Sequence, residues 1–426
     1  MAKFLIRLGL GFLALLLVAV ATFVAFAPSM LDRQMNPVVE HEPYAISKAA
    51  QALHQSIPVA DLHADSLLWN RDLLERNARG HVDIPRMREG GIFLQVFTAV
   101  TKTPRGQNYD VNSAAAPDDI ATLVKAQRWP RRTWDSRVER ALYQAEKLAG
   151  FAERDRALAV IRTAGDLARA ISADSGRRDA LAALREFDRQ SAEDLDVIAL
   201  EAFEELERQS QRPAQVAAIL GIEGAHALDG DLANIDRLFD AGYRVVGLQH
   251  FFDNRLGGSL HGTSGEGLTA FGRNAVSRMR DRDMVIDVAH SSEKVVRDAL
   301  ALGAGPLIVS HTGFNGHCES PRNISDDVMA EIAADGGLIG VGFWADVTCD
   351  ASPAGIADAI IYGIDRFGAA HIALGSDFDG TVTTELDASE MAAITQALLD
   401  RGVPPDDIRR VMGGNAVRFF LDHLPD

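Results

Sequence analysis

The sequence predicts a (β/α)8 barrel of the TIM type, which would include the whole body of the chain. Short apolar, β-rich runs alternate with helical patterns over the 426 residues, which is typical of a parallel sheet built from βα units. The number of runs, eight, is the number of strands that closes such a barrel. The runs are Val59–His63, Ile92–Thr98, Val216–Glu223, Tyr243–His250, Met284–His290, Pro306–His311, Gly337–Phe343 and His371–Asp377.

A second observation favours the same fold. Six of the eight runs end at, or just beside, a residue that can bind a metal or move a proton: His63, Glu223, His250, His290, His311 and Asp377. Active sites of these barrels lie at the C-terminal ends of the strands, so one site would collect all six. A doubly wound sheet is the alternative fold, but no Gly-x-Gly-x-x-Gly fingerprint follows the first run.

The N-terminus carries an apolar segment. Lys3 and Arg7 precede the run Leu8–Ala27, which has about the 20 apolar residues that a membrane-spanning helix needs. We therefore expect residues 1–28 to be an uncleaved anchor, with the catalytic body exported to the periplasmic or extracellular side. A cleaved signal peptide is the alternative, although Pro28 disfavours cleavage after Ala27.

The remaining chain divides into a linker and a body. Residues 29–57 read as a linker with a short helix around Ala45–Gln55, and residues 58–426 as the barrel. Between the second and third strands, about residues 105–212 read as a highly charged helical insertion. We interpret this insertion as solvated surface helices, with a lid or an assembly surface as the alternative.

The amino-acid composition excludes some classes of binding partner and metal site. The net charge of -17 and the sequence pI of about 5.1 argue against a nucleic-acid partner. Two cysteines are too few for a zinc–thiolate site. The sequence is compatible with a homodimer without fixing the oligomeric state.

Five of the polar side chains form a predicted binuclear metal centre. His63 and Asp65 point to the same face of a strand, and an imidazole beside a carboxylate suits zinc. Glu223, whose two oxygens can each bind one cation, would serve both ions. One Zn²⁺ would use His63, Asp65 and Glu223, and the other Glu223, His290 and His311, with a bridging water or hydroxide.

Many short motifs stand in an order that resembles a known family over about residues 57–421. They are Asp61-Leu-His-Ala-Asp65, Gly221-Ile-Glu-Gly224, Leu248-Gln-His250, Gly267-Leu-Thr-Ala-Phe-Gly272, Asp287-Val-Ala-His290, Val309-Ser-His311, Arg322-Asn323, Gly375-Ser-Asp-Phe-Asp-Gly380 and Gly414-Asn415. The sequence resembles the membrane (renal-type) dipeptidases, zinc metallopeptidases related to the amidohydrolase superfamily. That resemblance implies a (β/α)8 barrel with two zinc ions and hydrolysis of dipeptides, in some members with a C-terminal D-residue.

The resemblance also implies residue roles. Glu223 matches the bridging carboxylate of the catalytic centre, and His250 matches a histidine that contacts the substrate and the tetrahedral intermediate. Arg322 matches the arginine that holds the substrate's free carboxylate, for which a bidentate guanidinium is suited. Asp377 matches an aspartate that handles the proton of the attacking water.

Some features depart from the family or lie outside its motifs. The helical segment around residues 174–212 is longer than the family norm, and the stretch Gly342–Val347 lacks a tyrosine that mammalian members have. Asp379 is interpreted as structural, and His226 and His317 as neighbours of the centre. The histidines placed outside the site are His41, His54, His81, His261, His371 and His423.

The two cysteines are predicted to pair. Cys318 and Cys349 follow the sixth and seventh strands, and relatives in the family carry a disulfide at the matching positions. Two free thiols are the alternative.

For the function, the alternatives are hydrolysis of another amide or ester, such as an N-acyl amino acid or a lactone, and a catalytically inactive barrel used for binding. Arg322 argues against substrates that lack a carboxylate, and the complete ligand set argues against inactivity.

Overall fold

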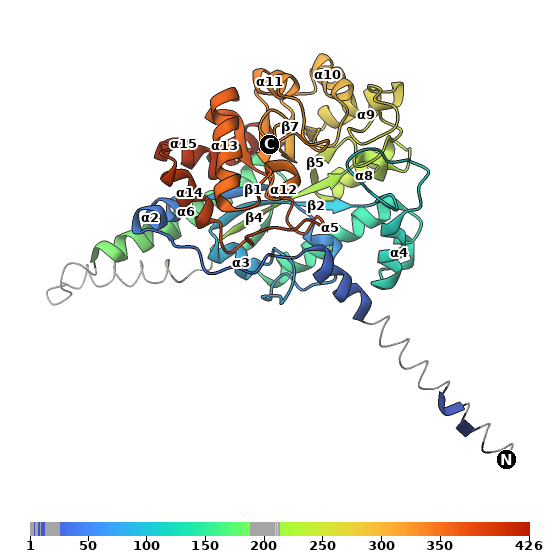
Figure 1. Cartoon of the computed structure of the whole chain (residues 1–426), viewed down its shortest axis with the longest axis horizontal. Helices are drawn as coiled ribbons and strands as arrows, with labels where there is room; N and C mark the ends of the chain where they lie inside the picture. Colours follow the sequence, from blue (N-terminus) through green and yellow to red (C-terminus); the bar gives the residue numbers. More distant parts are fainter. Residues whose placement is uncertain are drawn as a thin grey trace.

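The computed structural model describes residues 26–187 and 214–426, together with residues 4, 7–8, 10–12, 209 and 211. Most of the predicted N-terminal anchor and the later part of the predicted insertion lie outside these residues. Figure 1 shows a strand-built centre surrounded by helices.

Eight parallel strands form a closed ring, which confirms the predicted (β/α)8 barrel. In ring order they are β1 (Val59–Ala64), β2 (Ile92–Val100), β4 (Val216–Glu223), β5 (Tyr243–Gly247), β6 (Val285–Asp287), β7 (Ile308–Thr312), β8 (Leu338–Val341) and β9 (Ile372–Leu374). The ring closes between β9 and β1, where Asp61 pairs with Leu374. Every residue of the barrel strands is buried, as expected when helices cover the outer face of a parallel sheet.

One further strand lies outside the ring. β3 (Leu158–Val160) pairs with the first residues of β4, Val216–Ala218, and β5 pairs with β4 further along. The sequence predicts only helices between β2 and β4, so β3 is an addition. A run of three residues within a charged segment is too short to display a strand period.

The helices follow the strands and cover the barrel. Several begin at a serine or aspartate whose side chain accepts a backbone N–H of the first turn, as Ser292 does for Val295. They are α2 (Lys48–Gln55), α3 (Ile84–Glu89), α4 (Asp119–Ala126), α5 (Arg137–Arg154), α6 (Ala164–Phe187), α8 (Ala233–Ala241), α9 (Ala270–Arg280), α10 (Glu293–Ala301), α11 (Asp326–Ala334), α12 (Ala345–Thr348), α13 (Pro353–Phe367), α14 (Ala392–Asp400), α15 (Pro405–Arg409) and α16 (Asn415–His423).

The predicted membrane anchor is contradicted. Within the described part of the chain, no helix combines the length and the apolar character that a bilayer crossing needs. The membrane-tethered location that depends on this anchor is withdrawn with it. The apolar run Leu8–Ala27 falls mostly on residues outside the description.

Candidate metal centre and substrate pocket

The polar residues predicted to form the site all lie at the C-terminal end of the barrel. His63 and His311 lie within β1 and β7, Glu223 is the last residue of β4, and Asp65 directly follows β1. The remaining three lie just beyond their strands, because β5, β6 and β9 end earlier than the sequence predicts. These residues are His250, His290 and Asp377. Beyond the last strand hydrogen bonds the backbone can turn, so these side chains point across the mouth of the barrel.

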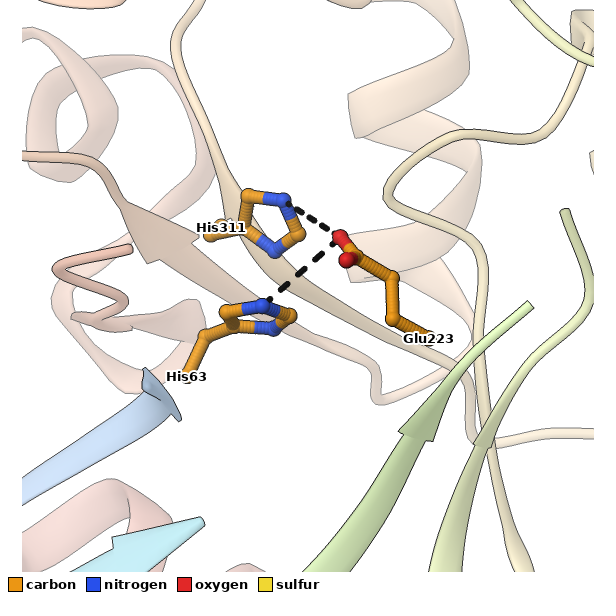
Figure 2. A group of neighbouring side chains, drawn as sticks. All are labelled: His63, Glu223 and His311. Atoms are coloured by element: carbon orange, nitrogen blue, oxygen red, sulfur yellow. Dashed lines mark ion pairs between the residues drawn. The ribbon is translucent and has the colours of Figure 1, made fainter. Parts of the chain in front are cut away.

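The carboxylate of Glu223 points toward His63 and His311, which come from other strands (Figure 2). Its Oε1 atom is 3.5 Å from His311 Nε2 and 3.7 Å from His63 Nε2. The same oxygen is 3.1 Å from His290 Nε2, and the other oxygen, Oε2, is 3.1 Å from His250 Nε2. One buried carboxylate thus lies among four imidazoles, as a bridging ligand requires.

The donor atoms fall into three overlapping groups. Each group has its donor atoms within 4.8 Å of one another: His63, Glu223 and His311; Glu223, His250 and His290; His63, Asp65 and Asp377. This grouping differs from the two predicted triplets, because Asp377 and His250 also come within ligand distance. Within the described part of the chain, His63 Nε2 is buried without a hydrogen-bond partner, although the carboxylates of Asp65 and Asp377 lie 3.4 Å and 3.8 Å away. A cation between these donors fits that arrangement.

Ser310 fixes the tautomers of two of the histidines. Its hydroxyl donates to Asp287 Oδ2 at 2.6 Å, so its oxygen can only accept from His63 Nδ1 at 3.2 Å and His311 Nδ1 at 2.9 Å. Both Nδ1 atoms therefore carry hydrogen, so when these imidazoles are neutral their Nε2 lone pairs face the centre. Sequence reasoning assigned no role to Ser310 or Asp287, although both stand inside the motifs Val309-Ser-His311 and Asp287-Val-Ala-His290.

The electrostatics of the centre favour a bound cation. Burial raises the pKa of Glu223 well above its usual range, and the nearby carboxylate of Asp65 raises it further. Burial also raises the pKa of Asp377 to about 8. Burial alone would lower the pKa of His63, but the carboxylates of Asp65 and Glu223 outweigh it and raise that pKa to about 10. Positive charge placed between these groups would relieve the mutual repulsion of the carboxylates.

Arg322 is a buried cation held by neutral groups. Its guanidinium donates to the carbonyl oxygens of Ala289 at 2.9 Å and His311 at 2.7 Å, and to Thr312 Oγ1 at 3.2 Å. Among the described residues, no carboxylate lies within ion-pair distance of this side chain, which is only 1% exposed. Burial lowers its pKa. A buried guanidinium without a counter-ion favours an anionic ligand.

A cavity of about 450 Å³ opens above the centre, and Glu223, His250, Arg322 and Asp377 all line it. His250 is neutral, because burial lowers its pKa to about 4. Asp377 adopts a left-handed backbone conformation with φ of 59°, which aspartate tolerates better than most residues. The volume falls in the range of small-molecule sites, so a dipeptide-sized ligand fits.

Tyr109 also lines the cavity, and the sequence did not reveal it. It lies in the loop between β2 and α4, and its hydroxyl accepts from Trp344 Nε1 at 3.1 Å. Burial raises its pKa to about 12, so the hydroxyl stays neutral. Trp344 belongs to the stretch Gly342–Val347 that lacks a tyrosine, so another segment supplies a tyrosine to the pocket.

The other histidines divide differently from the prediction. His261, placed outside the site, has its ring 5.6 Å from that of His290, and its Nδ1 lies 2.7 Å from the carbonyl oxygen of Tyr109. The long loop after β5 carries His261 back to the mouth, which periodicity could not show. His226 hydrogen-bonds Thr101 Oγ1 at 3.1 Å beside His250, whereas His317 packs on Tyr362 of α13.

The predicted disulfide is present. Cys318 and Cys349 are bonded with their Cα atoms 5.6 Å apart and 31 residues of separation. The closed loop contains Arg322. Asn323 joins the same two segments by donating to the carbonyl oxygens of Cys318 at 2.8 Å and Val347 at 2.9 Å.

Comparisons with known proteins agree with this architecture. A family model described as membrane dipeptidase, peptidase family M19, matches residues 47–422. The chain is 31% identical over 224 residues to the dipeptidase aclJ of Aspergillus oryzae, an alignment that covers 49% of this chain and 52% of that protein. The chain thus spans about half the length of the curated relatives it matches.

Solved structures show the same fold. A probable dipeptidase, PvdM, from Pseudomonas aeruginosa superposes with a TM-score of 0.63 at 18% identity, covering 88% of this chain and 98% of that one. A metallopeptidase from Rhodobacter sphaeroides, solved with a phosphinate mimic of the dipeptide L-Ala-D-Ala, gives a TM-score of 0.59 at 21% identity, covering 86% and 99%.

Proposed function

The chain belongs to the membrane dipeptidase family, peptidase family M19, and from that premise we propose that it is a metal-dependent dipeptidase. The observation that carries the proposal is the pairing of two features in one cavity. A cluster of buried metal donors surrounds Glu223. The guanidinium of Arg322, which has no carboxylate partner among the described residues, lies 3.4 Å from His290, one of those donors. A metal centre beside an anion anchor suits a small substrate with a free carboxylate.

We propose two zinc ions as the cofactor. His63, Asp65, Glu223, His290 and His311 would hold them, with Glu223 shared between both. When bound, such a pair supplies a nucleophilic water at neutral pH and a Lewis acid for the scissile carbonyl. The support is the set of buried Nε2 lone pairs that Ser310 directs at Glu223, because an imidazole ligand must present a lone pair to a metal.

The protein's own groups would orient the dipeptide and move its protons. Arg322 would bind the C-terminal carboxylate in a bidentate manner. Asp377 would accept the proton of the attacking water and deliver it to the leaving amine, for which a carboxylate with a raised pKa is suited. His250, neutral and within the cavity, would contact the substrate carbonyl as its carbon becomes tetrahedral.

The stereochemistry of the substrate is a finer part of the proposal. The Rhodobacter sphaeroides metallopeptidase was solved with a mimic of L-Ala-D-Ala, and this chain shares its fold. We therefore include dipeptides with a C-terminal D-residue among the proposed substrates.

A dipeptide panel tests the proposal directly. Purified protein reconstituted with zinc should hydrolyse L,L- and L,D-dipeptides, lose activity with a chelator, and regain it when zinc is returned. Amidating the C-terminus of the best dipeptide should abolish most turnover. Robust turnover of lactones, or of N-acyl amino acids in preference to dipeptides with a free amine, would replace dipeptidase with another hydrolase. Failure on every substrate despite bound metal would favour the inactive binding barrel.

A further inference from the structure

The catalytic cavity continues into an apolar region that the proposed chemistry does not use. Its wall combines side chains from three places: the helical residues 26–35, the turn after β1, and α4. We call this region the apolar annex, and its residues are Leu31, Met35, Leu68, Trp69, Ile120 and Leu123. Met35 packs against an apolar cluster that contains Trp69 and Ile120.

The N-terminal residues of the annex are fixed to the barrel by buried polar contacts. Asp32 forms ion pairs with Arg71 at 3.3 Å and Arg79 at 2.7 Å, and Arg71 also pairs with Asp379 at 2.7 Å. Asn36 accepts the backbone N–H of Thr381 at 2.9 Å. We call this set the N-terminal seam; it comprises Asp32, Asn36, Arg71, Arg79 and Asp379.

The chain beyond the seam is also joined to the barrel. Val39 donates its N–H to the carbonyl oxygen of Thr384 at 2.8 Å, and Thr384 donates to Pro37 at 3.2 Å. The blue chain in Figure 1 follows the body from the neighbourhood of α4 toward α2. Residues 32–39 are therefore part of the folded body, although the sequence predicts a linker there.

The position of the annex indicates what would fill it. Arg322 follows β7, whereas the annex residues of the barrel follow β1 and β2, which lie three and four strands from β7 around the ring of eight. The annex also contacts the loop after β9, since Trp69 Nε1 donates to the carbonyl oxygen of Asp379 at 2.7 Å. A dipeptide anchored by its carboxylate at Arg322, with its peptide bond at Glu223, extends its N-terminal residue toward the annex.

We propose that the apolar annex binds the side chain of the substrate's N-terminal residue, and that Leu31 and Met35 from the N-terminal segment set a preference for large apolar side chains there. The proposal rests on the proposed dipeptidase function. Burying an apolar side chain against this wall favours binding in proportion to the area removed from water. Discrimination by an apolar pocket is modest, about 10- to 200-fold in kcat/KM.

The test compares Gly-Ala, Ala-Ala, Leu-Ala and Phe-Ala on the zinc-loaded full chain. In the wild type, kcat/KM should rise from Gly-Ala to Leu-Ala by about tenfold or more. Met35→Gln and Leu31→Gln should each lower kcat/KM for Leu-Ala several-fold more than for Gly-Ala. Met30→Gln is the matched control, because Met30 neighbours Leu31, is 62% exposed and does not line the cavity.

Each outcome decides between the two proposals. Hydrolysis of all four dipeptides without an increase from Gly-Ala to Leu-Ala overturns the annex but leaves the dipeptidase function intact. An equal loss on Gly-Ala and Leu-Ala in both variants also overturns it, because a wall that contacts the N-terminal side chain must affect the larger side chain more. Hydrolysis of none of the four by the wild type overturns both proposals. Leu31 is 37% exposed, so its variant keeps the test valid if Met35→Gln folds poorly.

Discussion

The catalytic cavity and the N-terminal seam meet just after β9, and each contains a buried aspartate. The pKa values of these two aspartates are shifted in opposite directions. Asp377 faces the catalytic cavity and Asp379 belongs to the N-terminal seam, and both adopt a left-handed φ, of 59° and 64°. Burial raises the pKa of Asp377 to about 8. Burial acts on Asp379 in the same direction, but Arg71 and His81 outweigh it and lower its pKa.

The difference lies in whether the protein itself provides partners. The carboxylate of Asp379 accepts from Ser66 Oγ at 2.6 Å and from the N–H of His81 at 2.7 Å, in addition to its ion pair with Arg71. In the cavity, Arg322 has no carboxylate within ion-pair distance among the described residues. Within that part of the chain, Asp377 faces only His63, at 3.8 Å, and that histidine also faces Asp65 and Glu223. Charges satisfied within the protein stabilise the fold, whereas unsatisfied ones indicate the ligands that the cavity binds.

The largest effect is expected at Glu223, the carboxylate closest to the most donors. Glu223→Gln keeps the shape but removes the charge that two cations would share. We expect fewer than two metal ions per chain and loss of nearly all turnover, because one ligand is missing from both ions. Elemental analysis of the purified variant, together with its kcat on the best dipeptide, checks this. Two tightly held ions with normal activity would contradict the shared-ligand role.

Replacing each of the two aspartates by asparagine should affect a different property, kcat for Asp377 and the free energy of unfolding for Asp379. Asp377→Asn should lower kcat by about 10²- to 10⁴-fold, as expected for loss of a general base, with little loss of stability. Asp379→Asn should instead lower the free energy of unfolding by about 3–5 kcal/mol, because it removes the nearer of the two carboxylates that pair with the buried Arg71.

Urea unfolding and steady-state kinetics on both variants measure the free energy of unfolding and kcat. The wild type and Asp400→Asn, a change on an exposed part of α14, serve as controls for the loss of one negative charge. If Asp377→Asn unfolds as easily as Asp379→Asn, the distinction between a satisfied and an unsatisfied carboxylate is wrong.

The next prediction concerns Arg322, the buried positive charge of the cavity. Arg322→Lys keeps the positive charge but cannot present two parallel N–H groups to a carboxylate. We expect kcat/KM to fall by roughly 30-fold, equivalent to about 2 kcal/mol for a charged hydrogen bond, with most of the change in KM. Measuring the amidated dipeptide alongside separates the cause, because the amide should lose little further activity in the variant.

Much of the cavity could be predicted from the sequence, because strand ends of a parallel barrel converge. The apolar runs ending in His63, Glu223, His290 and His311 imply a shared site before any contact is known. His261 could not be found this way, since it returns to the mouth through a loop whose path depends on tertiary contacts.

The N-terminal seam was the least predictable region. Asp32, Arg71 and Asp379 are far apart in the sequence and follow no period, and single charged residues usually indicate solvent exposure. The segment before β1 therefore reads as a linker, although it forms one wall of the cavity. Burial of charged groups depends on the partners that the fold provides, and sequence pattern alone does not identify those partners.

The disulfide gives the smallest expected effect on activity and extends the comparison to covalent support. Replacing Cys318 and Cys349 together by serine removes the bridge across 31 residues. We expect the free energy of unfolding to fall by about 3 kcal/mol through the entropy of the unfolded chain. Asn323 still joins the two segments by its hydrogen bonds to Cys318 and Val347, so Arg322 should stay near its position. KM should therefore rise only a few-fold while kcat changes little. A collapse of kcat instead would mean that the bridge, and not the backbone carbonyls around the guanidinium, positions the anion anchor.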